Sequence, residues 1–181
     1  NWTETNFKYV RYNPRKDINR FGLSITSLDG GVSGIPDLDS LSEYNKENKT
    51  HYKETDFNIH TPVYQYPELQ NILDPIKHDI CRTHVLRLDS GGFFPAHRDF
   101  IKNHFNSFRL IIPLKNFNPP TTVFVIQDKI KYWEPGYVYF VDTAKIHYLF
   151  NASNEPSYWV IINALLNRNT IDYVTSNMKY Q

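Results

Sequence analysis

The feature that most constrains the fold is a series of short strand-like runs in the second half of the chain. Turn-forming pairs such as Gly91-Gly92, Pro119-Pro120 and Pro135-Gly136 separate neighbouring runs. The runs cover residues 84–88, 93–100, 108–114, 121–126, 129–133, 137–141, 146–150 and 158–165. This spacing predicts a β-sandwich or barrel.

Composition agrees with a sheet-rich fold of one domain. The 181 residues include 12 Phe, 13 Tyr and 3 Trp, which fit half-buried pleated surfaces. We expect a single domain over 1–181, with N-terminal bracing and loops in 1–81, a β core in 82–165 and a C-terminal extension in 166–181.

The first half of the chain is less regular. Residues 20–50 are rich in Gly, Pro and polar side chains, which predicts surface loops and turns. Residues 57–64 could form a strand, although Pro62 favours a sheet edge. Apolar residues three and four apart after Pro67 predict a helix that Pro75 kinks or ends.

Charge and cysteine content limit the classes of binding partner and the cellular compartment that we expect for this protein. The formal net charge of +1 favours neither nucleic acid nor an anionic membrane, and no apolar run is long enough to span a bilayer. The sequence also starts without the basic and apolar segments of a secretory signal. Cys81 is the single cysteine, which suits a reducing compartment. We therefore expect a cytoplasmic protein that binds no nucleic acid and no membrane.

Polar side chains interrupt two of the apolar runs. On a strand, His97 and Asp99 would project to the same face, because side chains two residues apart point the same way. His147 lies in a later apolar run, where a packed core histidine is the alternative reading. Together the three match a facial triad of two histidines and one carboxylate, which suits non-heme Fe(II) better than zinc because three coordination positions stay open.

The order of these motifs resembles that of 2-oxoglutarate-dependent oxygenases. The similarity is greatest to the aspartyl/asparaginyl β-hydroxylase-like group, which includes some hydroxylases of free proline. It rests on residues 87–99, 108–114 and 133–151 and extends over about 82–165. The resemblance implies a mainly β, double-stranded β-helix fold of the jelly-roll, cupin-like type.

The resemblance also implies roles for individual residues. His97, Asp99 and His147 match the iron ligands and catalytic centre, and Arg109 matches an arginine that binds a carboxylate. The implied enzyme uses Fe(II), 2-oxoglutarate as cosubstrate and dioxygen to hydroxylate an unactivated C–H bond of an amino acid, free or in a peptide. Arg87 or Arg98 would then pair with a free amino acid, whereas a groove lined by the loops would hold a peptide.

One position departs from the family pattern. Trp159 stands where the family places an arginine for the far carboxylate of 2-oxoglutarate, and tryptophan offers one N–H and no charge. Arg109, Arg87 or Lys145 could replace it, the cosubstrate could bind differently, or activity could be lost. His84, on the first core strand, is read as a packing residue.

Two alternatives to an oxygenase remain open at this point. The chain could be a cupin-like binding module or an inactive relative, which the Trp159 departure favours. It could also be a metal-dependent isomerase or hydrolase that uses the same three ligands without oxygen.

Overall fold

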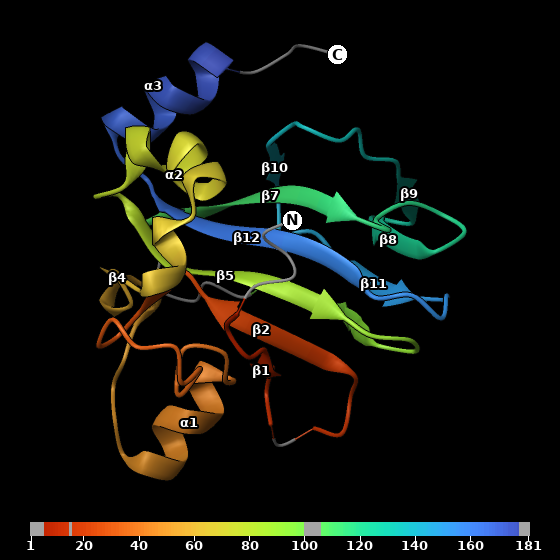
Figure 1. The fold of residues 1–181 in the computed structure, drawn as a ribbon, viewed down its shortest axis with the longest axis horizontal. Coiled ribbons are helices and arrows are strands. Elements are labelled where there is room, and N and C mark those ends of the chain that lie inside the picture. The colour runs from red at the N-terminus through yellow and green to blue at the C-terminus, as the bar shows by residue number, and fades with distance from the viewer. Residues whose placement is uncertain (1–5, 15, 100–105, 178–181) are drawn as a thin grey trace.

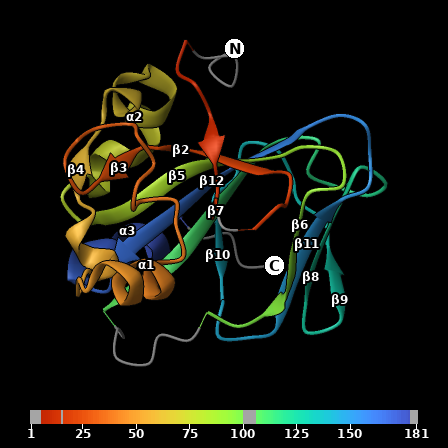
Figure 2. The same cartoon turned by 90° about the horizontal axis from the view of Figure 1, so that it is seen from below.

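The structure is a computed structural model that describes residues 6–14, 16–99 and 106–177. Two antiparallel sheets lie face to face (Figures 1 and 2). In order across the large sheet, the strands are β1 (Val10–Arg11), β2 (Arg20–Ser24), β5 (Ile80–Leu88), β12 (Ser157–Leu165), β7 (Ser107–Lys115) and β10 (Tyr139–Val141). In the small sheet they are β6 (Phe93–His97), β11 (His147–Asn151), β8 (Thr122–Ile126) and β9 (Lys129–Lys131).

From β5 onward the chain alternates between the two sheets. β5, β7, β10 and β12 belong to the large sheet, and β6, β8, β9 and β11 belong to the small one. This path is that of a jelly roll, so the predicted mainly β, double-stranded β-helix fold is confirmed. Each predicted run corresponds to one strand, although the end of the second run, at Phe100, lies outside the described residues.

The large sheet packs on both of its faces. On β12, Trp159 and Ile161 point into a cluster between the two sheets, whereas Val160 and Ile162 point into a cluster beneath the helices, because side chains alternate along a strand. The helices α2 (Pro67–Leu73) and α3 (Arg168–Asn177) lie on the side away from the small sheet (Figure 2). The helices therefore cover one face of the large sheet, and the apolar cluster that contains Trp159 fills the space between the two sheets.

The helix predicted after Pro67 is confirmed. Proline occupies the first position of α2, and the 3₁₀ turn Asp74–Ile76, which contains Pro75, ends the helix.

The strand predicted over 57–64 is wrong for most of its length. Only β4 (Ile59–His60) is a strand, and it pairs with β3 (Thr26–Ser27). A 3₁₀ turn, Pro62–Gln65, follows because the Thr61 hydroxyl accepts a hydrogen bond from the backbone N–H of Val63. Another 3₁₀ turn, Glu54–Asp56, precedes the pair.

The prediction of surface loops over 20–50 is also wrong in part. β2 lies between β1 and β5 in the large sheet, and the helix α1 (Leu41–Asn48) follows it. A Cβ added at Gly22 would lie 2.8 Å from Leu38 Cδ1, so the glycine lets this segment pack closely on the sheet. Among the described residues, no helix has the length and apolar character needed to cross a membrane.

Candidate metal centre

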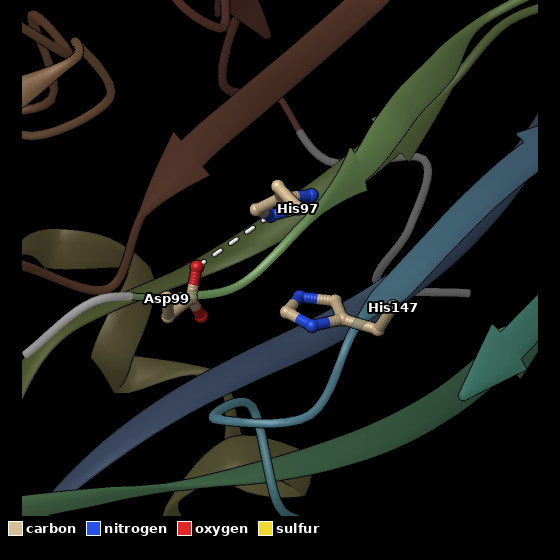
Figure 3. Close-up of side chains that lie close together, drawn as sticks. All are labelled: His97, Asp99 and His147. Atoms are coloured by element: carbon tan, nitrogen blue, oxygen red, sulfur yellow. Dashed lines mark ion pairs between the residues drawn. The ribbon is translucent and has the colours of Figure 1, made fainter. Parts of the chain in front are cut away.

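Strand register brings the two predicted histidine ligands together. β6 and β11 pair with His97 opposite His147, and the centres of the two imidazole rings are 4.3 Å apart. Asp99 follows β6, and its backbone N–H donates to the Thr143 carbonyl at 3.0 Å. One ligand atom from each of His97, Asp99 and His147 lies within 4.8 Å of the others, and the side chains converge on one point (Figure 3).

Backbone carbonyls orient both imidazoles. His97 Nδ1 lies 2.6 Å from the Pro95 oxygen, and His147 Nδ1 lies 3.0 Å from the Lys145 oxygen. A carbonyl oxygen only accepts, so each Nδ1 carries the proton and each Nε2 keeps a free lone pair. Metal-binding histidines are commonly held by such a hydrogen bond.

Asp99 is held in its ionised form. Burial would raise the pKa of this carboxyl, but the ion pair with Arg109 Nη1 and the nearby His97 imidazole outweigh burial and hold it well below its usual range. His97 Nε2 lies 3.5 Å from Asp99 Oδ1 (Figure 3). A carboxylate that is already charged is ready to bind a cation.

The two histidines differ in the direction in which their surroundings shift the pKa of the imidazole. The hydrogen bond to Asp99 raises the pKa of His97, whereas burial lowers the pKa of His147. His147 is therefore the more readily neutral of the two, and each imidazole binds a metal through Nε2 in its neutral form. Two neutral imidazoles and one carboxylate form the donor set preferred by non-heme Fe(II), so these residues fit that ion.

A polar network extends from Asp99 into the large sheet. Arg109 Nε donates to Asn163 Oδ1 at 3.1 Å, and Asn163 Nδ2 lies 3.4 Å from Glu54 Oε2. Glu54 pairs with the buried Arg82 at 2.5 Å. The candidate ligand is thereby connected to the segment that carries α1.

A cavity of about 690 Å³ is lined by two of the three candidate ligands, His97 and Asp99, and His147 lies outside the lining. His97, Asp99 and Arg109 lie at its wall, together with residues of the α1 region. Its other side chains include Tyr12, Arg20, Asp39, Asn45, Tyr52, Glu54, Arg82, Phe94, Arg98, Thr143 and Asn163. A space of this size is typical of small-molecule sites.

Of the other cations considered from the sequence, Arg87 and Lys145 lie outside the cavity and Arg98 lies at its wall. Arg87 stacks on Phe21 on the opposite face of the sheet, pairs with Asp89 at 2.9 Å and does not line the cavity, so of the cations considered it is not placed to bind a ligand there. Lys145 pairs with Asp142 at 3.5 Å and does not line the cavity. Arg98 is exposed at the cavity wall.

The positions of the remaining predicted residues are also clear. Trp159 is 1% exposed and packs against Phe124 and Trp133 between the sheets. His84 is buried against the ring of Tyr12, in agreement with a packing role.

A family profile described as aspartyl/asparaginyl beta-hydroxylase matches residues 40–165. The chain belongs to this family. The match covers α1, the jelly-roll strands and all three candidate ligands of this β-hydroxylase-family protein. No curated protein matches the chain in sequence.

Solved structures similar to this family member include cupins. One is a predicted oxalate decarboxylase from Thermotoga maritima, with 19% identity, coverage of 52% of this chain and 74% of that chain, and a TM-score of 0.38. A cupin domain from Bordetella pertussis Tohama I has 15% identity, coverage of 49% and 83%, and a TM-score of 0.36. A further structure, a protein called TT1209 from Thermus thermophilus, has 14% identity, coverage of 86% and 90%, and a TM-score of 0.39.

Sequence reasoning missed several polar residues of this β-hydroxylase-family site. Arg20 and Arg82, on β2 and β5, both line the cavity. A signal was present, since Arg20, Gly22 and Ser24 alternate with apolar residues, as on a half-buried strand. The glycine- and proline-rich surroundings of this short segment concealed it.

Proposed function

We propose that the protein is an Fe(II)- and 2-oxoglutarate-dependent oxygenase that hydroxylates an amino acid, free or in a peptide. The observation that carries this proposal is the convergence of His97, Asp99 and His147 beside a cavity large enough for small molecules. Family membership adds the reaction class, a hydroxylation.

The three converging side chains would hold Fe(II) through two Nε2 atoms and one carboxylate oxygen. Bound Fe(II) would supply the site at which dioxygen oxidises 2-oxoglutarate to succinate and carbon dioxide and a C–H bond to an alcohol. The protein contributes fixed ligand geometry: the carbonyls of Pro95 and Lys145 set the imidazole planes.

Arg109 keeps Asp99 charged and oriented, and it lines the cavity as well. Its Nε and Nη1 are already engaged with Asn163 and Asp99, so we assign it first to positioning the ligand. It would also contribute positive potential to a carboxylate bound beside the metal.

The substrate would occupy the part of the cavity next to α1. Hydroxyl groups such as those of Ser42 and Tyr52 line this wall and offer hydrogen bonds to an amino acid backbone. The other proposed reactant is dioxygen, and neither nucleic acid nor a membrane has a role in this proposal.

A second candidate function is a cupin-like binding module without oxygenase activity. The position of Trp159 favours it, because the aromatic interior offers no cation where the family pattern has an arginine. The same cavity would then bind a ligand without oxidising it.

Anaerobic titration with Fe(II) and 2-oxoglutarate separates the two candidates. The oxygenase predicts a weak visible charge-transfer band, absent in His97→Ala and Asp99→Ala and retained in the control His51→Ala, whose side chain is exposed outside the cavity. Release of succinate after oxygen is admitted is the second readout. Iron binding without the band and without succinate would favour the binding module.

A further inference from the structure

The cavity contains one buried cation without an acidic partner. Three arginines of the large sheet line it: Arg20 on β2, Arg82 on β5 and Arg109 on β7. Arg82 pairs with Glu54 and Arg109 pairs with Asp99. Within residues 6–14, 16–99 and 106–177, no ion pair with a carboxylate includes Arg20, and its buried Nε has no hydrogen-bond partner.

Arg20 is nevertheless almost fully enclosed. The residue is 4% exposed, and its buried Nε has no hydrogen-bond partner among the described residues. A buried cation without a counter-charge is costly, and burial accordingly lowers the pKa of Arg20. An anion bound in the cavity would remove this cost.

Aromatic rings hold the guanidinium in place. Its central carbon lies 4.3 Å from the centre of the Phe94 ring and 5.7 Å from that of Tyr12. These cation–π contacts orient the group but satisfy none of its N–H donors, and its Nε has no hydrogen-bond partner in the described part of the chain. The flat guanidinium is therefore preorganised for a planar anion.

Arg20 also lies near the candidate metal centre. The Phe94 ring that supports the guanidinium stacks on the His97 imidazole, with ring centres 6.3 Å apart. Arg20, His97 and Asp99 all line the same cavity. A ligand of a few carbon atoms could reach from the metal centre to this arginine.

We propose that Arg20 binds a carboxylate group of a ligand whose other end lies at the His97–Asp99–His147 cluster. Guanidinium and carboxylate are matched in shape and charge and form paired hydrogen bonds. The choice of ligand rests on the proposed function: the carboxylate is either the far one of 2-oxoglutarate or that of a free amino acid substrate. Arg20 would in the first case replace the family arginine that is Trp159 here.

Calorimetric titration of the protein loaded with Mn(II) tests this proposal without turnover. We compare wild type, Arg20→Met and the control Arg87→Met, whose guanidinium also stacks on aromatic rings but lies on the opposite sheet face. The ligands are 2-oxoglutarate and 2-oxopentanoate, which has the same carbon chain with a methyl group in place of the far carboxylate. Mn(II) affinity and circular dichroism of each variant check the metal site and the fold.

If Arg20 holds the cosubstrate, Arg20→Met weakens binding of 2-oxoglutarate by about 30-fold or more and leaves 2-oxopentanoate and Mn(II) unchanged. If it holds the substrate, 2-oxoglutarate binding is unchanged. In that case Arg20→Met no longer binds free amino acids in the presence of Mn(II) and 2-oxoglutarate. Under the same conditions wild type binds an amino acid but not its amide, which lacks the carboxylate. Arg87→Met behaves as wild type in both cases.

Equal binding of 2-oxoglutarate and of all amino acids by wild type and Arg20→Met would overturn the proposal for Arg20 and leave the proposed function standing. Failure of wild type to bind Mn(II) or 2-oxoglutarate would instead contradict the proposed function. In that case the binding of glutarate to the metal-free protein tests Arg20 independently of the metal. Glutarate binding that is lost in Arg20→Met supports the anion site, whereas no binding of glutarate to wild type rejects it.

Discussion

At the scale of single residues, Trp159 shows why the family arginine has no place in this barrel. Its ring centre lies 5.8 Å from Phe124 and 5.9 Å from Trp133, and its N–H reaches only the Ser157 hydroxyl. A cation at this position would be surrounded by aromatic side chains without a carboxylate.

We therefore expect Trp159→Arg to lower the free energy of unfolding by more than about 3 kcal/mol, through lost packing and an unpaired buried charge. Trp159→Phe, which keeps an aromatic ring, should cost about 1–2 kcal/mol. Urea denaturation measures both. Equal stability of the two variants would show that the interior at 159 tolerates charge.

His84 makes the free energy of unfolding depend on pH. Burial lowers the pKa of His84 to about 3, from an ordinary value of 6.5. Between these values the unfolded chain binds a proton that the folded protein does not, so the free energy of unfolding falls as pH decreases from 6.5 towards 3.

This histidine should contribute a slope of up to about 1.4 kcal/mol per pH unit in that window. His84→Gln should reduce the slope, and the control His78→Gln, in an exposed turn, should not. Urea denaturation at pH 4, 5, 6 and 7 supplies the comparison. Parallel pH profiles for wild type and His84→Gln would contradict this role.

At the scale of elements, the turn between β5 and β6 fixes the position of β2. A Cβ at Gly92 would lie 2.3 Å from the backbone oxygen of Asn19, the residue before Arg20. Gly91 has a φ of +72° but no atom near an added Cβ. A substitution at Gly92 therefore tests steric overlap with β2, and a substitution at Gly91 tests the backbone strain of a positive φ.

We expect Gly92→Ala to destabilise the protein by more than about 2 kcal/mol, because the backbone at Asn19 must move. Gly91→Ala should cost only about 1 kcal/mol for the left-handed conformation. Thermal unfolding measures both. A smaller loss for Gly92→Ala than for Gly91→Ala would show that β2 can shift freely.

At the scale of the whole molecule, a polar network joins the N-terminal region to the barrel. Arg82 donates to the carbonyl oxygens of Asp37 and Asp39 and pairs with Glu54, and these residues precede or follow α1. One buried guanidinium therefore contacts the segments on both sides of α1 and helps to hold the cavity wall in place.

Glu54→Gln should loosen this wall and leave the barrel folded. Because the Glu54 side chain is partly exposed, we expect a loss of about 1 kcal/mol, seen as roughly fivefold faster hydrogen exchange of amides in α1. The exposed Glu68→Gln in α2 is the matched control. Unchanged exchange in α1 would show that the wall is held by other contacts.

Local patterns predicted the jelly-roll strands and the candidate ligands because they depend on neighbouring residues. Alternation along each run marks a strand, and His97 and Asp99 stand out because they are two residues apart in an apolar run. The same reasoning failed for β2, whose five residues are too few to reveal a period among glycines and polar side chains.

The sequence by itself thus determined a sheet-rich chain with a candidate metal-binding pair, His97 and Asp99, and a third candidate ligand at His147. Only the tertiary structure decided that His147 lies opposite His97, that Arg87 faces away from the site and that Arg20 is buried without a counter-charge among the described residues. The reason is that periodicity belongs to one segment of backbone, whereas register, sheet face and charge pairing arise only when distant segments meet.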